Sequence, residues 1–272
     1  MKFDMHVHTY YSDGIFSPKE VVEKAVQLGL DGIAITDHDT VLGVKEAIDA
    51  SKEYPNFSVI PGIEFSCIHE DEEVHILGYF INYESLELEK ILDKLNSARR
   101  NRTGKIVAKL NQLGMDIEEK DVLEIGKKNF TGRVHVAKAL IKKGYVSSVE
   151  EAFEKYLERG QPAYVERESL SINKAIRLIN SLGGVSILAH PGLLKKRDKI
   201  IKYCIDAGIL GLECIHSKHR KEDVEGLKRI VQENNLIATG GSDCHGRKID
   251  GEILLGRYYC DLNKIPEMKG RL

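Results

Sequence analysis

The chain has 272 residues, of which 42% are apolar and 30% charged, and its 40 basic residues nearly balance its 42 acidic ones. This composition excludes wholesale disorder, and the net charge of -2 argues against a surface that binds nucleic acid over its whole area. There is no apolar run of about 18 residues, so no membrane-spanning helix is expected. The start of the chain shows no export signal and the five cysteines are never spaced C-x-x-C, which predicts a cytoplasmic protein with reduced thiols.

Short apolar runs alternate with amphipathic stretches over much of the chain. The first predicted helix follows Ser17 as N-cap, with Pro18 at its first position, Glu20 completing a capping box and Gly29 ending it. Alternating strands and helices with connections of this length predict parallel pairing in a sheet or barrel. Strands are expected at seven places: 2–8, 32–37, 58–66, 73–81, 185–190, 210–215 and 236–241.

The middle of the chain has a different pattern. It contains no convincing strand, and leucines and isoleucines at helical spacing predict a long helix that ends at Gly114. Two further helices are expected near 132–143 and 148–158. The pattern predicts an α/β barrel with a helical insertion domain that covers its active site, the barrel formed by residues 1–85 and 168–272 and the insertion by 86–167.

Histidines and carboxylates lie at or near the ends of six predicted strands. The first strand carries Asp4, His6 and His8 two residues apart, so their side chains share one face. Each residue alone has an ordinary explanation, as a satisfied core histidine or a salt-bridged acid. Together, at the barrel face where active sites form, they predict a metal site, because a metal offsets the cost of such buried charges. The further candidates are Asp13, His38, Glu64, His75, His190, Asp243 and His245.

The types of ligand narrow the choice of metal and reaction. Histidine nitrogens and carboxylate oxygens without paired cysteines favour zinc, manganese or iron. Nine good ligands are too many for one ion, so we expect a multinuclear site. Two ions about 3.5–4 Å apart can clamp the attacking and leaving oxygens of a phosphoryl displacement. The sequence therefore predicts a metal-dependent hydrolase of phosphate esters.

Six motifs carry a family resemblance: D-x-H-x-H-T (4–9), S-D-G (12–14), T-D-H-D (36–39), P-G-x-E (61–64), A-H-P (189–191) and G-S-D-C-H-G (241–246). Together with His75 they resemble the PHP (polymerase and histidinol phosphatase) family. The resemblance implies a distorted seven-stranded β/α, TIM-like barrel with three divalent metal ions, Mn²⁺ first among the candidates and Zn²⁺ or Fe²⁺ as alternatives. It also implies the ligand sets, whose nine residues are the expected catalytic residues: His6, His8, Glu64 and Asp243 for one metal, Glu64, His75 and His190 for the second, and Asp13, His38 and His245 for the third.

The middle segment resembles the branch of this family that acts on nucleotides. The similar stretches are G-R-x-H-x-A-x-A-L (132–140) and A-F-x-x-Y-L-x-x-G-x-P-A-Y-V (152–165). The resemblance implies a nucleoside 3′,5′-bisphosphate substrate, such as adenosine 3′,5′-bisphosphate, or a short 5′-phosphorylated RNA. We expect no association with a membrane and no obligate protein partner. Histidinol phosphatase is the alternative within the family, and a non-phosphate hydrolase of the amidohydrolase kind is the alternative outside it.

Two arginines of the long helix are candidate phosphate contacts. Arg99 and Arg102 fall close to its apolar face, so they need partners inside the protein. Internal acids such as Glu124 are one explanation, and a phosphate gripped by the guanidinium forks is the other. Arg133 and His135 start the next helix, where an anion is favoured, although an ordinary helix start with a surface arginine explains them as well.

The mechanism expected from these residues is attack by a metal-bridging hydroxide, with no covalent phosphoenzyme. Asp4 and Asp39 are expected to orient the ligand histidines. His216 and His219 lie just beyond a strand end, so either can contact substrate or donate a proton, and a surface position explains them nearly as well.

Overall fold

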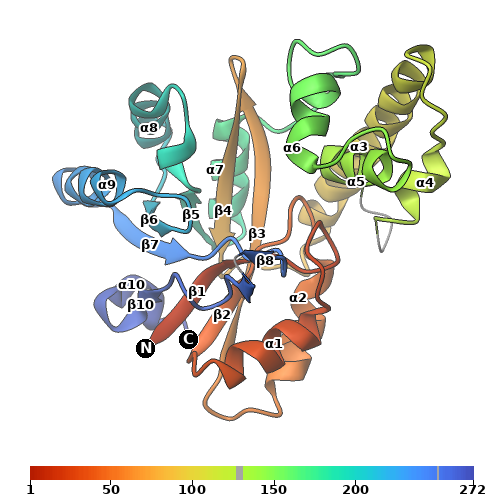
Figure 1. Cartoon of the computed structure of the whole chain (residues 1–272). Helices are drawn as coiled ribbons and strands as arrows, with labels where there is room; N and C mark the ends of the chain where they lie inside the picture. Colours follow the sequence, from red (N-terminus) through yellow and green to blue (C-terminus); the bar gives the residue numbers. More distant parts are fainter. Residues whose placement is uncertain (127–130, 250) are drawn as a thin grey trace.

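The computed structural model describes residues 1–126, 131–249 and 251–272 (Figure 1). Its centre is an eight-stranded sheet in the order β10-β1-β2-β3-β4-β5-β6-β7, and all seven predicted strands are present. The predicted α/β barrel fold is confirmed, with one short additional strand at the edge. The strands are β1 (Lys2–Val7), β2 (Gly32–Ile35), β3 (Ser58–His69), β4 (Glu72–Tyr79), β5 (Val185–Leu188), β6 (Gly211–His216), β7 (Ile237–Gly241) and β10 (Cys260–Asp261).

The two ends of the sheet meet where β7 passes β1. His8 N donates to the Cys244 carbonyl at 3.0 Å, and Cys244 N donates to the His6 carbonyl at 3.3 Å. Gly241 permits this approach, because a Cβ at that position would lie 2.4 Å from the His6 Cβ. This contact between β1 and the end of β7, the seam of the barrel, places the residues that follow β7 directly beside His6 and His8.

The sheet is not uniformly parallel, which corrects the predicted topology. β1, β2 and β3 run parallel, as do β5, β6 and β7, but β4 is antiparallel to both β3 and β5. Only Glu70 and Asp71 join β3 to β4, and a parallel pair needs a crossover of a dozen residues or more. Glu64 and His75 therefore lie within the long β3–β4 hairpin and not at the carboxyl ends of parallel strands.

Helices of the barrel surround the sheet, and apolar clusters join them to it. The capping box at Ser17 and Glu20 is present as predicted, and Gly29 follows the helix with φ 72°. Apolar residues of α1 and α2 pack on β1 and β2, and those of α7, α8 and α9 pack on β3 to β6. The helices are α1 (Pro18–Gln27), α2 (Leu42–Ser51), α7 (Ile172–Ser181), α8 (Arg197–Asp206), α9 (Lys221–Glu233) and α10 (Pro266–Lys269), with 3₁₀ turns η3 (Pro191–Leu193) and η4 (Leu262–Lys264) and a small ribbon of β8 (Lys248–Ile249) and β9 (Glu252–Ile253).

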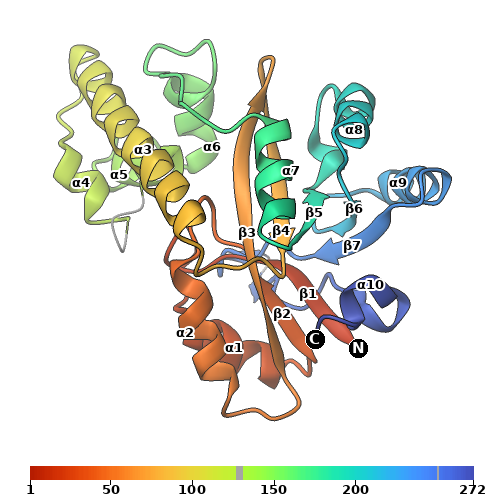
Figure 2. The same cartoon turned by 180° about the vertical axis from the view of Figure 1, so that it is seen from behind.

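The segment between β4 and α7 contains helices, turns and loops, and no strand among its described residues. Its helices lie on one side of the β3–β4 hairpin, and α8 and α9 lie on the other (Figures 1 and 2). It has an apolar cluster of its own, which includes Ile106, Leu110, Val136 and Leu140. The division of the chain into a barrel and an insertion domain stays a prediction. The elements are α3 (Leu86–Gln112), α4 (Glu119–Leu123), which was not predicted, α5 (Arg133–Lys142), α6 (Val149–Ala152) and the π-helix η2 (Phe153–Leu157).

None of the helices in the described ranges is long and apolar enough to cross a membrane.

Candidate metal centre and phosphate pocket

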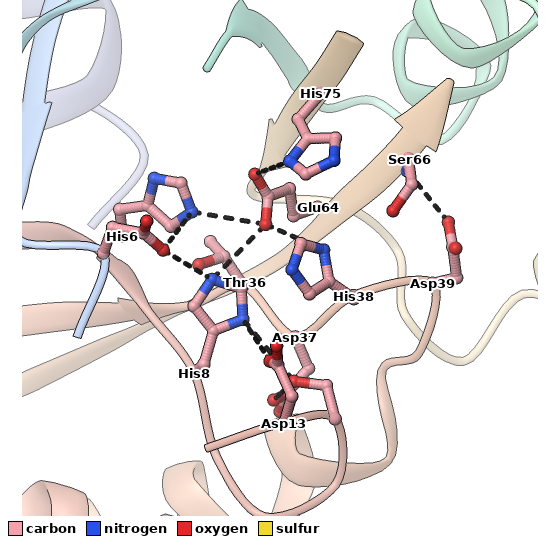
Figure 3. A network of polar contacts seen from close by, with 12 residues as sticks. His6, His8, Asp13, Thr36, Asp37, His38, Asp39, Glu64, Ser66 and His75 are labelled. Carbon is pink, nitrogen blue, oxygen red and sulfur yellow. Dashed lines mark hydrogen bonds and ion pairs between the residues drawn. The ribbon is translucent and has the colours of Figure 1, made fainter. Parts of the chain in front are cut away.

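Glu64 lies at the centre of a cluster of histidines (Figure 3). Its carboxylate is 1% exposed, and its Oε2 atom lies 2.9 Å from His38 Nδ1, 3.3 Å from His8 Nε2 and 3.4 Å from His6 Nε2. The other oxygen, Oε1, lies 2.9 Å from His75 Nδ1 and 3.2 Å from His190 Nε2. One buried carboxylate thus faces five imidazole rings, which come from both halves of the barrel.

Asp243 and Asp13 extend the cluster on the side of His8. Asp243 Oδ1 lies 3.1 Å from His8 Nε2 and 3.5 Å from His6 Nε2. His245 lies between the two acids, with Nδ1 3.5 Å from Asp243 Oδ1 and Nε2 3.1 Å from Asp13 Oδ1. The structure therefore brings all nine predicted metal-ligating residues into one contiguous cluster.

The donor atoms of this cluster fit divalent metal ions. Three subsets offer ligand atoms that lie within 4.8 Å of one another: His8 with Asp13, His38 and His245; His6 with His8 and Glu64; and His38 with Glu64 and His75. Buried polar atoms without a hydrogen bond are costly, and a cation between them removes that cost. Several atoms of the cluster are of this kind, namely His6 Nε2, His8 Nε2, Asp13 Oδ1, His38 Nδ1 and Glu64 Oε2.

In the metal-free protein, protons compensate the charges of the cluster. Burial alone would lower the pKa of the His8 imidazole, but the Asp243 and Glu64 carboxylates raise it to about 10. Burial is likewise outweighed at His75, whose pKa Glu64 raises to about 10. At His190 burial dominates, and the pKa falls to about 4. Metal binding must therefore displace protons, which makes metal affinity fall as the pH falls.

The acid that contacts Nδ1 of the His6 ring is Glu213, which is absent from the predicted site. Its Oε1 atom lies 3.0 Å from His6 Nδ1, and the side chain is fully buried. The expectation that Asp4 orients a histidine ring is wrong: its carboxylate accepts the Ser242 N–H at 2.8 Å and the Gly256 N–H at 2.9 Å. The sequence signal that could have revealed Glu213 was an acid inside the otherwise apolar β6.

Asp39 contacts arginines and no histidine, which corrects its predicted role. Its carboxylate accepts a hydrogen bond from Arg99 Nε at 3.0 Å and lies 3.5 Å from Arg167 Nη1. Arg99 Nη2 also donates to Ser66 Oγ at 3.0 Å. Arg99 on α3 is therefore joined to the barrel by a buried ion pair. Arg167 was missed because it stands between two glutamates in the sequence and resembles part of a solvated charged stretch.

Arg102 has a different environment. It is 9% exposed, and its Nε atom donates to the Val165 carbonyl at 2.7 Å. Within the described ranges no carboxylate lies at ion-pair distance from it, and burial together with Arg133 lowers its pKa. The alternative partner Glu124 is ruled out, because its carboxylate instead pairs with Lys142 at 3.4 Å. The Glu73 carboxylate offsets part of this fall in the Arg102 pKa, and the positive charge of Arg102 at the cavity wall favours an anion there.

Arg133 and His135 also face the cluster from the start of α5. Arg133 forms an ion pair with Glu73, and its guanidinium carbon lies 5.1 Å from the Phe153 ring centre. His135 Nδ1 accepts the Gly132 N–H at 3.2 Å, and burial lowers its pKa to about 4. His135 is therefore neutral at physiological pH, and Arg133 carries its charge at the cavity wall.

The two histidines after β6 separate into different environments. His216 Nε2 lies 3.4 Å from Asp243 Oδ2, so this buried ring adjoins the cluster, and its predicted contact with substrate stays a prediction. Both ring nitrogens of His219 face backbone groups, the Gly192 N–H at 3.1 Å and the Cys214 carbonyl at 3.0 Å. The expected substrate contact by His219 is therefore wrong, since its imidazole holds the turn after β5 against β6.

A cavity of about 220 Å³ lies against the metal cluster and joins a larger outer groove of about 580 Å³. The two share the walls formed by Glu73, Arg102, Arg133, Phe153 and Arg167. The inner cavity is lined by Asp13, His38 and His75 on one side, and on the other by Arg99, Arg102, Arg133 and His135 from the helical segment between β4 and α7. The outer groove adds the cations Arg159, Lys195 and Lys196, the ring of Tyr164, and acids that include Asp71 and Glu158.

A histidine–carboxylate cluster beside an arginine-lined cavity is what a phosphoesterase requires, and the comparison with known proteins agrees. Residues 4–199 match the model of the PHP domain family. The chain belongs to the PHP domain family. It is accordingly a metal-dependent phosphoesterase.

Two relatives have described activities. A 5′-3′ exoribonuclease of Haemophilus influenzae is 32% identical over 248 residues, which cover 90% of this chain and 90% of that one. A 3′,5′-nucleoside bisphosphate phosphatase of Chromobacterium violaceum is 29% identical over 247 residues, which cover 89% of this chain and 86% of the relative. A crystal structure from Bifidobacterium adolescentis, described as a metal-dependent phosphoesterase, matches with a TM-score of 0.88 and 32% identity over 99% of this chain and 96% of the other. Relatives of one fold thus act on different phosphate esters.

Proposed function

We propose that this phosphoesterase hydrolyses a phosphate ester of a nucleotide, either a nucleoside 3′,5′-bisphosphate such as adenosine 3′,5′-bisphosphate or a short 5′-phosphorylated RNA. The observation that carries the proposal is Arg102, a buried cation that forms no ion pair within the described ranges, at the junction of the inner cavity and the outer groove. An anion beyond the phosphate at the metal cluster satisfies it. A substrate with two phosphates, or with a further nucleotide, supplies that anion.

The nine clustered residues are the proposed metal ligands, in the sets expected from the sequence. They would hold three divalent ions, with Mn²⁺ the first candidate and Zn²⁺ or Fe²⁺ the alternatives. When bound, divalent ions activate a water molecule and neutralise the charge that develops on the phosphoryl group. The reacting phosphate lies in the inner cavity, beside His38 and His75. His216 adjoins the cluster and is the proposed proton donor to the leaving oxygen, because its ring faces Asp243.

Arginines hold the phosphates in this proposal. Asp39 neutralises part of the charge of Arg99 and Arg167 and fixes both guanidinium groups at the cavity wall. Asp39 and Glu73 are the two carboxylates that contact Arg99, Arg133 and Arg167, so these three guanidinium groups carry more positive charge than the two acids neutralise. Arg102 and Arg133 add donors where the cavity meets the outer groove. A guanidinium fork binds phosphate oxygens through two parallel hydrogen bonds, which orients the ester before reaction.

The outer groove favours a nucleotide over a small amino-alcohol phosphate such as histidinol phosphate. Its walls carry the aromatic rings of Phe153 and Tyr164, which offer stacking surface to a base. Lys195 and Lys196 lie farther along the same groove, where a second backbone phosphate of RNA would pass. The predicted cytoplasmic location is consistent with such a substrate and stays a prediction.

Phosphate release from a substrate panel tests the proposal. Adenosine 3′,5′-bisphosphate, AMP, histidinol phosphate and a 5′-phosphorylated oligoribonucleotide are compared at saturating Mn²⁺ and at saturating Zn²⁺. We expect kcat/KM for the bisphosphate or the RNA to exceed that for histidinol phosphate at least tenfold. A clear preference for histidinol phosphate would refute the nucleotide assignment and leave the phosphoesterase class intact.

A further inference from the structure

Glu213 is a carboxylate that contacts residues on both sides of Glu64. It lies on β6, and its side chain is fully buried. Its Oε1 atom is 3.0 Å from His6 Nδ1, and its Oε2 atom accepts the backbone N–H of His190 at 2.8 Å. His6 in turn faces Glu64 Oε2 at 3.4 Å, and His190 faces Glu64 Oε1 at 3.2 Å. The two oxygens of Glu213 therefore act through two histidines on the two oxygens of Glu64.

The contact with His6 selects which ring nitrogen is available. A carboxylate only accepts hydrogen bonds, so a neutral His6 must carry its proton on Nδ1. The lone pair is then on Nε2, the buried atom without a hydrogen-bond partner that points at Glu64 and Asp243. A metal ligand needs that lone pair, and a partner on the other ring nitrogen is the usual means of fixing it.

The contact with His190 holds a strained backbone. His190 has φ 31° and ψ 52°, a left-handed conformation that side chains other than glycine rarely adopt. Pro191 follows it and restricts its backbone further. The N–H of His190 donates to Glu213, and this hydrogen bond holds the turn with the ring directed at Glu64. Strain of this kind persists only where the surroundings enforce it.

We propose that Glu213 is a positioning residue that sets the metal affinity of both sides of the Glu64 bridge, through the tautomer of His6 and the strained turn at His190. The inference rests on the proposed ligand roles of Glu64, His6 and His190. It needs no particular substrate.

Glutamine at this position tests the inference, because it keeps the shape of Glu213 but has only one terminal oxygen that can accept a hydrogen bond. If its oxygen accepts from His190 N–H, its amide donates to His6 Nδ1 and forces the proton onto Nε2. If its oxygen faces His6, its amide opposes the His190 N–H. Glu213→Gln should therefore not substitute for the carboxylate, whereas a role in packing alone would be preserved.

The experiment measures Mn²⁺ binding by calorimetry for the wild type, Glu213→Gln, Glu213→Asp and the control Cys214→Ala. Cys214 is the buried neighbour on β6, and its thiol donates to the Leu212 carbonyl. We expect the dissociation constant to rise about 10- to 100-fold in Glu213→Gln and less in Glu213→Asp, which keeps the charge and reaches one partner. The control should stay within about twofold of the wild type. Should Glu213→Gln fail to fold, Glu213→Asp carries the test.

Melting of the metal-free proteins separates positioning from general stability. Unchanged Mn²⁺ affinity in Glu213→Gln, or a lower melting temperature without a loss of affinity, would overturn the inference. Tight Mn²⁺ binding by a wild type that releases no phosphate from nucleotides would overturn the proposed substrate and leave Glu213 in its role. A wild type that binds neither Mn²⁺ nor Zn²⁺ would overturn both.

Discussion

Arg99 and Arg102 lie one helical turn apart on α3, are about equally buried, and should respond in opposite ways to the same substitution. Arg99→Met and Arg102→Met each keep the apolar stem and remove the charge. Arg99 has a buried carboxylate partner in Asp39, whereas Arg102 donates only to the Val165 carbonyl among the contacts described. The first variant therefore tests a structural ion pair and the second a phosphate contact.

The magnitudes follow from these partners. Removing one member of a buried ion pair costs about 3–5 kcal/mol, and Asp39 keeps Arg167 at 3.5 Å, so we expect a loss of about 2–3 kcal/mol for Arg99→Met. Arg102→Met loses one hydrogen bond, about 1 kcal/mol, and removes a buried charge, so its stability should change little. Loss of its charged hydrogen bonds to phosphate should weaken binding of the transition state by about 2 kcal/mol or more. This loss corresponds to a fall in kcat/KM of roughly 30-fold.

Urea unfolding of the metal-free proteins and steady-state phosphate release from adenosine 3′,5′-bisphosphate measure the two effects. Arg100→Met is the matched control, because Arg100 is exposed on the same helix and donates a hydrogen bond to Ser97 Oγ. It should change neither quantity. The reasoning is refuted if Arg102→Met unfolds more easily than Arg99→Met while its kcat/KM equals that of the control.

Three further predictions follow from single positions. Burial lowers the pKa of His135 to about 4, against about 6.5 in the unfolded chain, so the unfolded state takes up a proton first and the protein loses stability as the pH drops from 6.5 to 4. His135→Gln should reduce the loss of unfolding free energy between pH 7 and pH 5 by about 2 kcal/mol, as measured by urea unfolding. An unchanged pH dependence would contradict this. Gly241→Ala should destabilise the barrel by about 3 kcal/mol by forcing β7 from β1, whereas Gly226→Ala in α9, where a Cβ meets open space, should be neutral or stabilising; equal melting temperatures would count against the seam. Lys195→Glu in the outer groove should raise KM about tenfold for a 5′-phosphorylated RNA and leave that for adenosine 3′,5′-bisphosphate within about twofold, and equal effects on both would show that the groove does not discriminate.

The strands and the candidate ligands were predictable because their signals are local. Apolar runs identified the seven strands, and histidines or acids inside those runs identified the cluster around Glu64. The antiparallel direction of β4 was also within reach, since six residues between the predicted strands 58–66 and 73–81 are too few for a parallel crossover. The short helix α4 was missed because five residues carry almost no periodicity.

Partnerships across the fold were not predictable from local patterns. Arg99 and Asp39 are 60 residues apart, and nothing in either stretch indicates the other. The sequence therefore predicted that Asp39 contacts a histidine ring, whereas the acid in that position is Glu213, 207 residues from His6. The helical face of Arg99 predicted its burial correctly, but only the folded chain distinguishes an arginine with a carboxylate partner from one without.

The central claim is that hydrolysis depends on metal held by the cluster around Glu64. Phosphate release from adenosine 3′,5′-bisphosphate is measured on protein stripped by a chelator, with its metal content verified, and again after Mn²⁺ is added back. The account predicts no release above background from the metal-free protein, recovery with Mn²⁺, and no recovery in Glu64→Gln. Undiminished hydrolysis by the verified metal-free protein would contradict it.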